Sequence, residues 1–501
     1  MEQSYFIGID NGGSSIKCVI FNQYGSIISS SSTRVPLSKP FDGYTERDSE
    51  DVWTANCHVI QAALQKADLN PSDVKAVSVC GYGGGLILLD QNGHPVIPCI
   101  VSTDSRANTL LKTFQENGID DQIYEYTFQR LWSGQHAMLL AWYQRECGDS
   151  LTDAAYALSI KDFIRYRLTG VIGTEVTDAS NTNLFNIHTQ KFDPEIFQIL
   201  GIEDLFSLLP ERIFSSFEIA GTISPKAAEL TGLLPGTPVA TGLYDVASCT
   251  LASGILDDSH LELIVGTWSI SGYLTKDLAS CQGRNNTLLS FLNDWYFSEE
   301  SSPTSASNLD WFIESFYKKI FSDAENVYEA CNLQVATLDP ADNDLIFLPY
   351  LYGSNTSNFV KACFFNLSGY HTPAHMLMAI YEGILFSLVQ HIRTLCGEQL
   401  PASARFSGGV SSSSIWCQML ADILGIPIET TDCKELGALG AAMCASIGCG
   451  LYKSPAEAVK NMYHAASVYT PDPQRTKLYA KKYAQYQKAV DCVNHFYSHE
   501  E

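Results

Sequence analysis

The amino-terminal segment constrains the fold more than any other part of this sequence. Apolar residues lie on both sides of a polar, glycine-containing stretch at residues 10–15, and Ile16, Cys18 and Ile20 then alternate with other residues as in a β-strand. A dinucleotide-binding fold would place a helix directly after the glycines. The segment therefore predicts a β-hairpin with a glycine turn, and it argues against a Rossmann fold.

A similar strand, Gly-Thr turn and strand recur at residues 261–276. A chain of 501 residues is too long for one ordinary core, so the repeat predicts two α/β domains of one type that face each other across a cleft. We expect the first domain at residues 1–245 and the second at 246–452. Residues 453–501 have the pattern of a polar, amphipathic helical tail.

Other local patterns predict individual elements. Asp48 and Ser49 are good caps for a helix that ends near Leu69, and residues 74–80 alternate as a strand before the glycine loop at 81–85. Apolar residues from Leu377 to Leu395 recur at helical spacing, and the Gly408-Gly409 turn precedes another helix. Residues 436–452 are rich in small residues and predict a close-packed helix.

Composition excludes several classes of partner. With 31 basic and 55 acidic residues, the formal charge is −24, which repels nucleic acid and anionic membrane surfaces. The 15 cysteines are odd in number and form no Cys-x-x-Cys pair, as in a protein of the reducing cytoplasm. The amino terminus lacks the pattern of a signal peptide. We therefore expect a cytoplasmic protein with no nucleic-acid or membrane partner.

Two aspartates point to a chemical function. Asp10 and Asp245 each follow an apolar strand and lie beside a glycine, where a carboxylate can project into a cleft. Glycine turns expose backbone N–H groups that can hold phosphate oxygens. Each feature alone is often structural, but together they suggest phosphoryl transfer, in which a carboxylate orients an alcohol and accepts its proton.

These residues carry a family resemblance. The DNGGSSIK segment, Asp245 after Gly242, the Gly266-Thr267 turn, the Gly408-Gly409 turn and residues 369–382 together resemble the FGGY family of carbohydrate kinases. That family has two actin/hexokinase-like (ribonuclease H-like) domains with an interdomain cleft. The strings WSGQHAMLLAW, VGTWSIS, ESSPTSASNLDWF and FLPYLYGSN are most similar to the L-xylulose (3-keto-L-gulonate) kinase branch.

The resemblance implies a role for each matching residue. Asp245 matches the catalytic base, and Asp10 matches a second catalytic carboxylate that, with Asp245, approaches Mg²⁺. The residues that match ATP- and phosphate-binding positions are Gly12, Gly13, Ser14, Ser15, Lys17, Gly266, Thr267, Gly408, Gly409 and Ser412. Those that match sugar contacts are Tyr82, Gly83, Asp104 and Trp132, together with Asp245. Asp104 also has the pattern of a helix cap, and Trp132 that of a packing residue.

The implied activity is ATP-dependent phosphorylation of a terminal hydroxyl of a ketopentose, with L-xylulose as first candidate, ATP and Mg²⁺ as cofactors and a homodimer as one allowed assembly. Gly81-Tyr82-Gly83 stands where glycerol kinases have Arg-Glu and D-xylulokinases have Met-His-Gly, which disfavours glycerol and D-xylulose. Other FGGY substrates, namely D-xylulose, L-ribulose, 3-keto-L-gulonate and gluconate, stay open. An actin- or chaperone-like ATPase and a noncatalytic sugar sensor are the alternatives from other classes.

Overall fold

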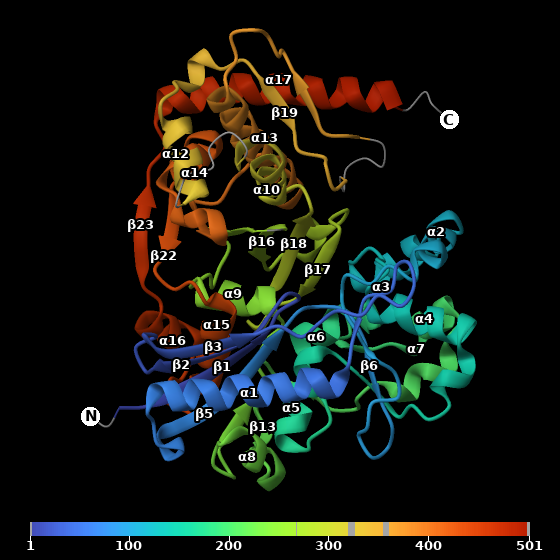
Figure 1. The fold of residues 1–501 in the computed structure, drawn as a ribbon. Helices are drawn as coiled ribbons and strands as arrows, with labels where there is room; N and C mark the ends of the chain where they lie inside the picture. Colours follow the sequence, from blue (N-terminus) through green and yellow to red (C-terminus); the bar gives the residue numbers. More distant parts are fainter. Residues whose placement is uncertain (1–2, 267, 319–325, 354–359, 498–501) are drawn as a thin grey trace. The chain divides into compact units, whose positions relative to one another are not determined.

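A computed structural model describes residues 3–266, 268–318, 326–353 and 360–497. By their internal contacts the residues form two compact units, each assembled from separate stretches of chain (Figure 1). The first unit comprises Met1–Leu256, Leu274–Ser298 and Glu435–His464, and the second Asp257–Tyr273, Glu299–Lys434 and Ala465–Glu501. The functional domain boundaries after residues 245 and 452 stay a prediction.

The first unit is built on a six-stranded sheet in the order β13-β14-β5-β1-β2-β3. Strands β1, β2 and β3 pair antiparallel, which confirms the hairpin predicted at the amino terminus, whereas β5 pairs parallel with both β1 and β14. The strands of this sheet are β1 Tyr5–Asn11, β2 Ile16–Asn22, β3 Ile27–Thr33, β5 Val74–Gly81, β13 Ile219–Thr222 and β14 Pro238–Ala240.

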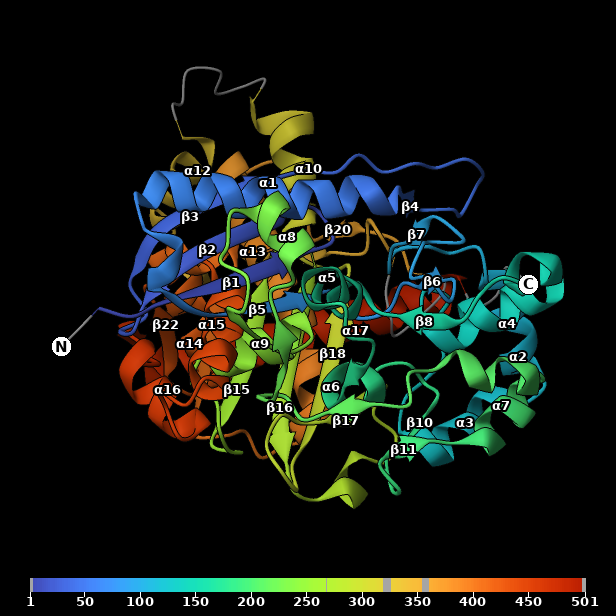
Figure 2. The same cartoon turned by 90° about the horizontal axis from the view of Figure 1, so that it is seen from below.

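Two helices cover opposite faces of this sheet (Figure 2). Helix α1, Ser49–Ala67, is capped as predicted by Asp48, whose carboxylate accepts hydrogen bonds from the N–H groups of Glu50 and Asp51. Helix α15, Leu436–Gly448, packs on the other face against β1 and β5. The approach requires a glycine, because a Cβ on Gly8 would lie 1.8 Å from the carbonyl oxygen of Ala438.

Further elements of the first unit surround the sheet and extend beyond it. They are β4 Glu46–Arg47, β6 Ile87–Leu89, β7 Cys99–Ile100, α2 Asn108–Glu116, α3 Ile119–Thr127, α4 His136–Glu146, β8 Tyr156–Leu158, α5 Ile160–Thr169, β9 Thr174–Glu175, α6 Val176–Ser180, β10 Phe185–Asn186, β11 Lys191–Phe192, α7 Pro194–Leu200, β12 Ile213–Phe214, α8 Pro225–Thr231, α9 Asp245–Ala252, β17 Asn286–Leu289 and α16 Pro455–Met462. The predicted strand after the glycine loop is β6.

The second unit repeats the sheet pattern of the first. Strands β15, His260–Val265, and β16, Ser269–Thr275, form the antiparallel pair that the sequence repeat predicts, and β15 pairs parallel with β21, Ser403–Ser407. The sheet continues from β21 through β22, Ile428–Thr431, to β23, Ala465–Tyr469. The expected two-domain α/β fold class is therefore confirmed.

The remaining elements of the second unit are mostly helical. They are β18 Tyr296–Ser302, α10 Ser307–Phe312, α12 Val327–Ala336, β19 Ile346–Leu348, β20 Cys363–Phe365, α13 Pro373–Cys396, α14 Ser414–Leu424 and α17 Pro473–Tyr497. The carboxyl-terminal segment contains the helices α16 and α17, but β23 lies between them and pairs with β22, so a separate helical tail stays a prediction. This edge strand is largely exposed, so its residues lack the apolar alternation that identifies a half-buried strand.

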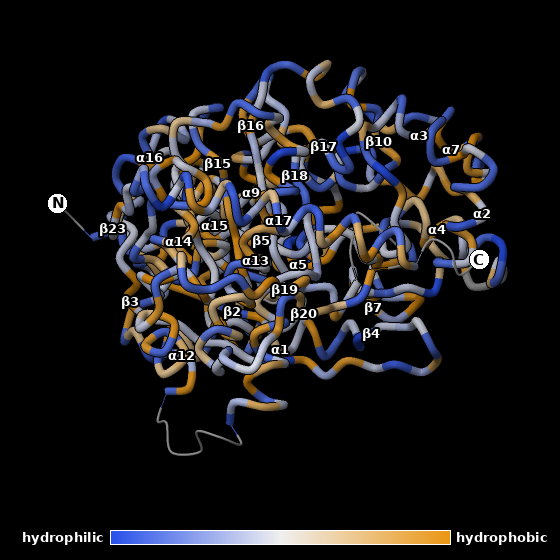
Figure 3. Tube along the Cα trace, turned by 90° about the horizontal axis from the view of Figure 1, so that it is seen from above, coloured by the Kyte–Doolittle hydropathy of each residue, from blue (hydrophilic) through white to orange (hydrophobic). Residues whose placement is uncertain are grey.

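Helix α13 forms much of the core of the second unit. It is long and apolar enough to cross a membrane, but 83% of its most apolar window is buried inside the protein, as in the core helix of a globular domain. Hydrophobic stretches of the chain, orange in Figure 3, include the region of α13 and α14. Helix α15 is likewise buried along most of its length, which confirms the close-packed helix predicted for this segment.

Candidate functional site

The two candidate catalytic aspartates lie at one edge of the first sheet. Asp10 is next to the last residue of β1 and pairs in register with Cys80 of β5. Asp245 is the first residue of α9, and the preceding Tyr244 bridges to Gly81 at the end of β5. Burial raises the pKa of the Cys80 thiol, and the charges of Asp10 and Asp245 raise it further, so both carboxylates lie near that thiol. The carboxyl ends of the parallel strands thus bring the two together.

Glycines permit the close packing around these aspartates. Gly242 has φ +72°, and a Cβ there would lie 1.9 Å from the carbonyl oxygen of Val79. A Cβ on Gly437 would lie 3.0 Å from Asp10 Oδ2, so the start of α15 is in contact with the Asp10 carboxylate. The Ser248 hydroxyl of α9 donates a hydrogen bond of 2.8 Å to the Gly437 carbonyl and links the two helices.

Asp10 has an unusual electrostatic environment. Burial raises its pKa to about 6, while Lys17 and a hydrogen bond with Cys80 oppose this rise and Glu435 adds to it. Lys17 is held by Glu435, with 2.7 Å between Nζ and Oε2. Burial lowers the pKa of Lys17, but the hydrogen bond and charge of Glu435 outweigh burial and the pKa is raised. Lys17, which the sequence predicts to bind phosphate, therefore already has a carboxylate partner in Glu435.

The predicted phosphate turn lies beside Asp10. The Gly12 N–H donates to the Ser15 carbonyl at 3.1 Å, which closes the turn between β1 and β2. Gly13 and Ser14 at its tip are exposed, and nothing described within 4 Å would obstruct a Cβ on Gly13. The tip of the turn is therefore accessible to a ligand.

The predicted sugar loop follows β5 at the same sheet edge. The Tyr82 N–H donates to the Asn11 carbonyl at 3.2 Å, and the Tyr82 hydroxyl lies 3.7 Å from Cys99 Sγ. A Cβ on Gly83 would lie 2.0 Å from Asn181 Nδ2, and one on the neighbouring Gly84 would lie 2.4 Å from the Trp132 ring. The structure thus brings Trp132 to the glycine loop of Tyr82 and Gly83, and a Cβ on Gly83 would lie 3.1 Å from the ring of Tyr244, the residue before Asp245.

Asp104 is bound on both carboxylate oxygens by protein groups. Its Oδ1 accepts hydrogen bonds from Arg106 N and Nε at 3.0 and 2.9 Å, and its Oδ2 from Thr45 N and Arg106 Nη2 at 2.7 and 2.8 Å. The residue is 1% exposed. Its carboxylate does not cap α2. The N-cap residue of that helix is Ala107, and no side chain accepts a capping hydrogen bond there. These four hydrogen bonds give Asp104 a structural role, because they tie Thr45 and Arg106 to it. Its contact with the sugar stays a prediction.

An open pocket of about 470 Å³ lies beside Asp104 in the first unit. The neighbours of Asp104 in sequence, Thr103 and Ser105, line it, as does Thr45, which hydrogen-bonds to Asp104. Lys39, Phe41, Asp42, Gly43 and Tyr44 complete its lining.

A buried ionic cluster below the Asp245 loop was missed in the sequence. Lys161 Nζ lies 3.1 Å from both Asp162 Oδ1 and Asp178 Oδ2 and 3.7 Å from Glu175 Oε2, and all four side chains are buried. Thr177 Oγ1 donates to Glu175 Oε2 at 2.6 Å and accepts from the Tyr244 N–H at 3.2 Å. The cluster therefore supports the backbone immediately before Asp245. The charged residues that recur among apolar ones at residues 160–178 are the signal that could have revealed it.

The second unit holds the other predicted phosphate and nucleotide residues. Gly266 follows β15 and Gly408 follows β21, and a Cβ on Gly408, whose φ is +93°, would lie 2.3 Å from the Val265 carbonyl oxygen. Gly409 and Ser412 bound a 3₁₀ turn before α14, in which the Ser412 hydroxyl donates to the Gly409 carbonyl at 3.1 Å. These four residues therefore lie at the carboxyl ends of two adjacent parallel strands. Thr267 lies outside the described residues.

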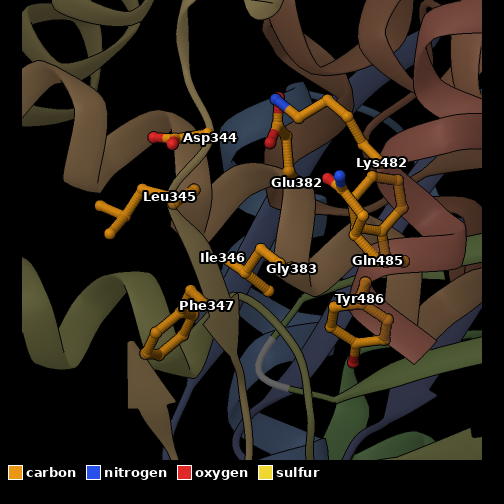
Figure 4. A pocket seen from close by; sticks show the side chains of 11 residues that line it. Asp344, Leu345, Ile346, Phe347, Glu382, Gly383, Lys482, Gln485 and Tyr486 are labelled. Atoms are coloured by element: carbon orange, nitrogen blue, oxygen red, sulfur yellow. The ribbon is translucent and has the colours of Figure 1, made fainter. Parts of the chain in front are cut away.

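A cavity in the second unit is too small for a substrate. It measures about 10 Å³, enough for one water molecule, and lies beside the buried pair Lys482 and Glu382 (Figure 4). Lys482 Nζ donates to Glu382 Oε1 at 2.5 Å and to the Pro340 carbonyl at 3.0 Å. The pair joins α17 to α13, and burial raises the pKa of Glu382 to about 7 despite the lysine charge.

The donor set of the first unit is compatible with Mg²⁺ brought by a nucleotide. No cluster of three or more histidine, cysteine or acidic side chains suited to a metal occurs among the residues described. Proteins commonly hold Mg²⁺ through one or two carboxylates while phosphate oxygens and water supply the other ligands. Asp10 and Asp245, both partly exposed at one sheet edge, fit that pattern.

Two carboxylates beside a glycine turn in the first unit, with further glycine turns at strand ends of the second, form the pattern expected of a phosphoryl-transfer enzyme. The sequence model for the N-terminal domain of the FGGY family of carbohydrate kinases matches residues 5–252, and that for the C-terminal domain matches residues 261–449. The chain belongs to the FGGY family of carbohydrate kinases.

Individual relatives agree with this assignment. The chain is 36% identical over 498 residues to a probable L-xylulose kinase from Pasteurella multocida, covering 98% of this chain and 99% of that protein. It is 34% identical to the L-xylulose/3-keto-L-gulonate kinase of Escherichia coli, covering 99% and 98%. The crystal structure of a ligand-bound xylulose kinase from Lactobacillus acidophilus superimposes with a TM-score of 0.89 at 24% identity, covering 99% of both chains, which shows the shared fold.

Proposed function

We propose that this kinase transfers the γ-phosphoryl group of ATP to the terminal hydroxyl of a ketopentose, with L-xylulose as first candidate. The proposal rests chiefly on Asp10 and Asp245, which share a sheet edge with the exposed Gly12–Ser15 turn. Two relatives whose names include L-xylulose, at 36% and 34% identity, support the choice of sugar.

In this proposal Asp245 is the catalytic base. Its carboxylate orients the sugar hydroxyl and accepts the proton as the new O–P bond forms and the bond between the γ-phosphorus and the bridging oxygen breaks, which leaves ADP. Asp10 and Asp245 would hold Mg²⁺, which when bound neutralises charge on the phosphate oxygens. The backbone donors of the Gly12–Ser15 turn bind those oxygens before and during transfer.

The other site residues divide between sugar and nucleotide. Tyr82, Gly83, Asp104 and Trp132 contact the sugar, and Asp104 also holds Thr45 and Arg106 in place. Gly266, Thr267, Gly408, Gly409 and Ser412 bind the nucleotide. We further propose a cytoplasmic location, in accordance with the cysteine content, and a homodimer as the assembly to test by light scattering.

The direct test is a coupled assay of ADP formation with L-xylulose, D-xylulose, L-ribulose, 3-keto-L-gulonate, glycerol and gluconate. We expect L-xylulose to give the highest kcat/KM and ADP formation without sugar to be negligible. Efficient turnover of a different sugar would replace the substrate but not the reaction. Rapid ATP hydrolysis that no sugar accelerates would favour an ATPase instead.

The assignment of the base is tested by Asp245→Asn. The amide cannot accept the proton, so kcat should fall by about 10³-fold or more while ATP binding persists. Asp204→Asn, which removes one exposed carboxylate from the same unit, is the matched control and should retain kcat. An Asp245→Asn enzyme with a near-normal rate would show that another group takes the proton.

A further inference from the structure

Arg47 occupies a position between two parts of the proposed site. It lies in the short strand β4, in register with Cys99 of β7, and is 3% exposed. Its Nη2 donates a hydrogen bond to the carbonyl oxygen of Gly13, at the tip of the phosphate turn. No sequence pattern marked this arginine, because nothing within a few residues of it indicates a ligand.

The surroundings of Arg47 also include the sugar loop. Burial raises the pKa of Tyr82 well above its ordinary value, and the Arg47 charge opposes this rise while the Asp245 charge adds to it. The Arg47 charge likewise opposes the rise that burial causes in the pKa of Cys99. The Arg47 guanidinium therefore lies close enough to Tyr82 to influence it electrostatically, and it also hydrogen-bonds to the carbonyl oxygen of Gly13.

The Arg47 guanidinium lacks the anionic partner that buried arginines normally have. Among the residues described, no carboxylate forms an ion pair with Arg47, and its buried Nε makes no hydrogen bond. The buried Arg106, by contrast, lies 2.7 Å from Glu46 and 2.8 Å from Asp104. A buried cation without an anion is costly, and that cost is relieved when an anion binds.

The charge balance of the phosphate turn strengthens this point. The chain carries a formal charge of −24, so a polyphosphate needs local positive charge. Lys17, the cation expected for that task, lies 2.7 Å from Glu435 and is already paired. Arg47 is thus the cation at the turn whose charge no described carboxylate neutralises.

We propose that Arg47 binds a phosphate group at the junction of the Gly12–Ser15 turn and the Tyr82 loop. The ligand class is a phosphate monoester or the phosphoryl group in transfer, which a guanidinium holds through charge-assisted hydrogen bonds. The inference rests on the proposed function, in which that group passes from nucleotide to sugar between these two loops. Arg47 then stabilises the negative charge on the phosphate oxygens.

The test replaces Arg47 with Gln and with Lys in the full chain. Glutamine removes the charge and lysine keeps it, while neither reproduces the full reach of the guanidinium to the Gly13 carbonyl. A response to phosphate that follows the charge therefore separates a phosphate ligand from a residue that only holds the turn. Arg34→Gln, which removes one exposed arginine from the same unit, is the matched control. The first readout is the thermal midpoint with inorganic phosphate and with sodium chloride at equal ionic strength.

We expect inorganic phosphate to raise the midpoint of the wild type and of Arg34→Gln, and Arg47→Gln to lose most of this rise. In the sugar assay, kcat of Arg47→Gln should fall about 100-fold, with partial recovery in Arg47→Lys. The proposal is overturned if phosphate does not stabilise the wild type, if Arg47→Gln keeps the phosphate response, or if Arg47→Gln phosphorylates L-xylulose as fast as the wild type.

The phosphate measurement needs neither sugar nor turnover, which separates the two proposals. If no sugar of the panel is phosphorylated but Arg47→Gln loses the phosphate response, the substrate assignment fails and the anion site stands. If L-xylulose is phosphorylated equally well by wild type and Arg47→Gln, the kinase assignment stands and the role of Arg47 is refuted.

Discussion

Asp10 lies near the positive charge of Lys17 and the negative charge of Glu435. Removal of either charge should therefore shift the pKa of Asp10, in opposite directions for the two charges. Lys17 opposes the rise in the pKa of Asp10, and Glu435 adds to it. The proposed role of Asp10 needs its charged form, so activity should fall as the pH drops through its pKa of about 6. Replacement of Lys17 by Met should move this acid limb to higher pH, and Glu435→Gln should move it to lower pH.

The size of the effect follows from the strand register. Asp10 and Lys17 are directly opposed on β1 and β2, where facing Cβ atoms are about 5 Å apart, so their charges are about 6 Å apart. With an effective dielectric constant of about 40 for this partly exposed pair, the Coulomb energy is about 1.4 kcal/mol, or about one pKa unit. We expect the acid limb of Lys17→Met to rise by about one pH unit, and that of Glu435→Gln to fall by about half a unit.

The assay is the pH dependence of kcat/KM, whose acid limb reports the essential ionisation of the free enzyme. Lys17→Arg keeps the charge and is the control, with its limb expected near that of the wild type. If the activity of Lys17→Met is too low for a pH profile, Glu435→Gln still tests the account, because its acid limb should move to lower pH. Shifts of the same sign in both neutral variants, or no shift in either, would refute the electrostatic account of Asp10.

Two further predictions concern buried contacts. Lys482→Met leaves the Glu382 carboxylate buried without its partner, so the free energy of unfolding should drop by about 3–5 kcal/mol, as measured by urea denaturation. The pKa of Glu382 in the folded protein, about 7, is higher than in the unfolded chain. The contribution of this carboxyl group to stability is therefore present below about pH 4.5 and is lost as the pH rises through about 7. The variant should accordingly have its lowest free energy of unfolding above pH 7. Thr177→Val removes the oxygen that links Glu175 to the Tyr244 N–H and should lower the free energy of unfolding by about 1–3 kcal/mol and kcat by about tenfold. Thr177→Ser keeps the hydroxyl, and equal losses in Ser and Val variants would contradict this link.

Patterns confined to neighbouring residues predicted much of the fold correctly. The alternation around residues 10–15 predicted the β1–β2 hairpin, the Asp48 cap marked the start of α1, and the repeat at 261–276 predicted the β15–β16 pair. In each case the signal is a periodicity or a cap within one element. The exposed strand β23 was missed because an edge strand without a buried face carries no such signal.

The candidate site was predicted only in part. The sequence singles out Asp10 and Asp245 separately, because each follows an apolar segment beside a glycine. In the structure Asp10 lies near the end of β1, Asp245 begins α9, and both lie near Cys80. The surroundings of other residues were not predictable. Both oxygens of Asp104 accept hydrogen bonds from Thr45 and Arg106, and these bonds form only after the loops pack.

Interactions between neighbouring residues specify which segments become strands, turns and capped helices, because backbone sterics and hydrophobic periodicity act over a few residues. The motifs along nearly the whole chain likewise specify the family. Which charges meet depends instead on how distant segments pack. Lys17 and Glu435 are 418 positions apart, and they pair because α15 packs against β1 through Gly8 and Gly437. The same packing, together with β4, leaves Arg47 beside the phosphate turn without a carboxylate partner among the described residues.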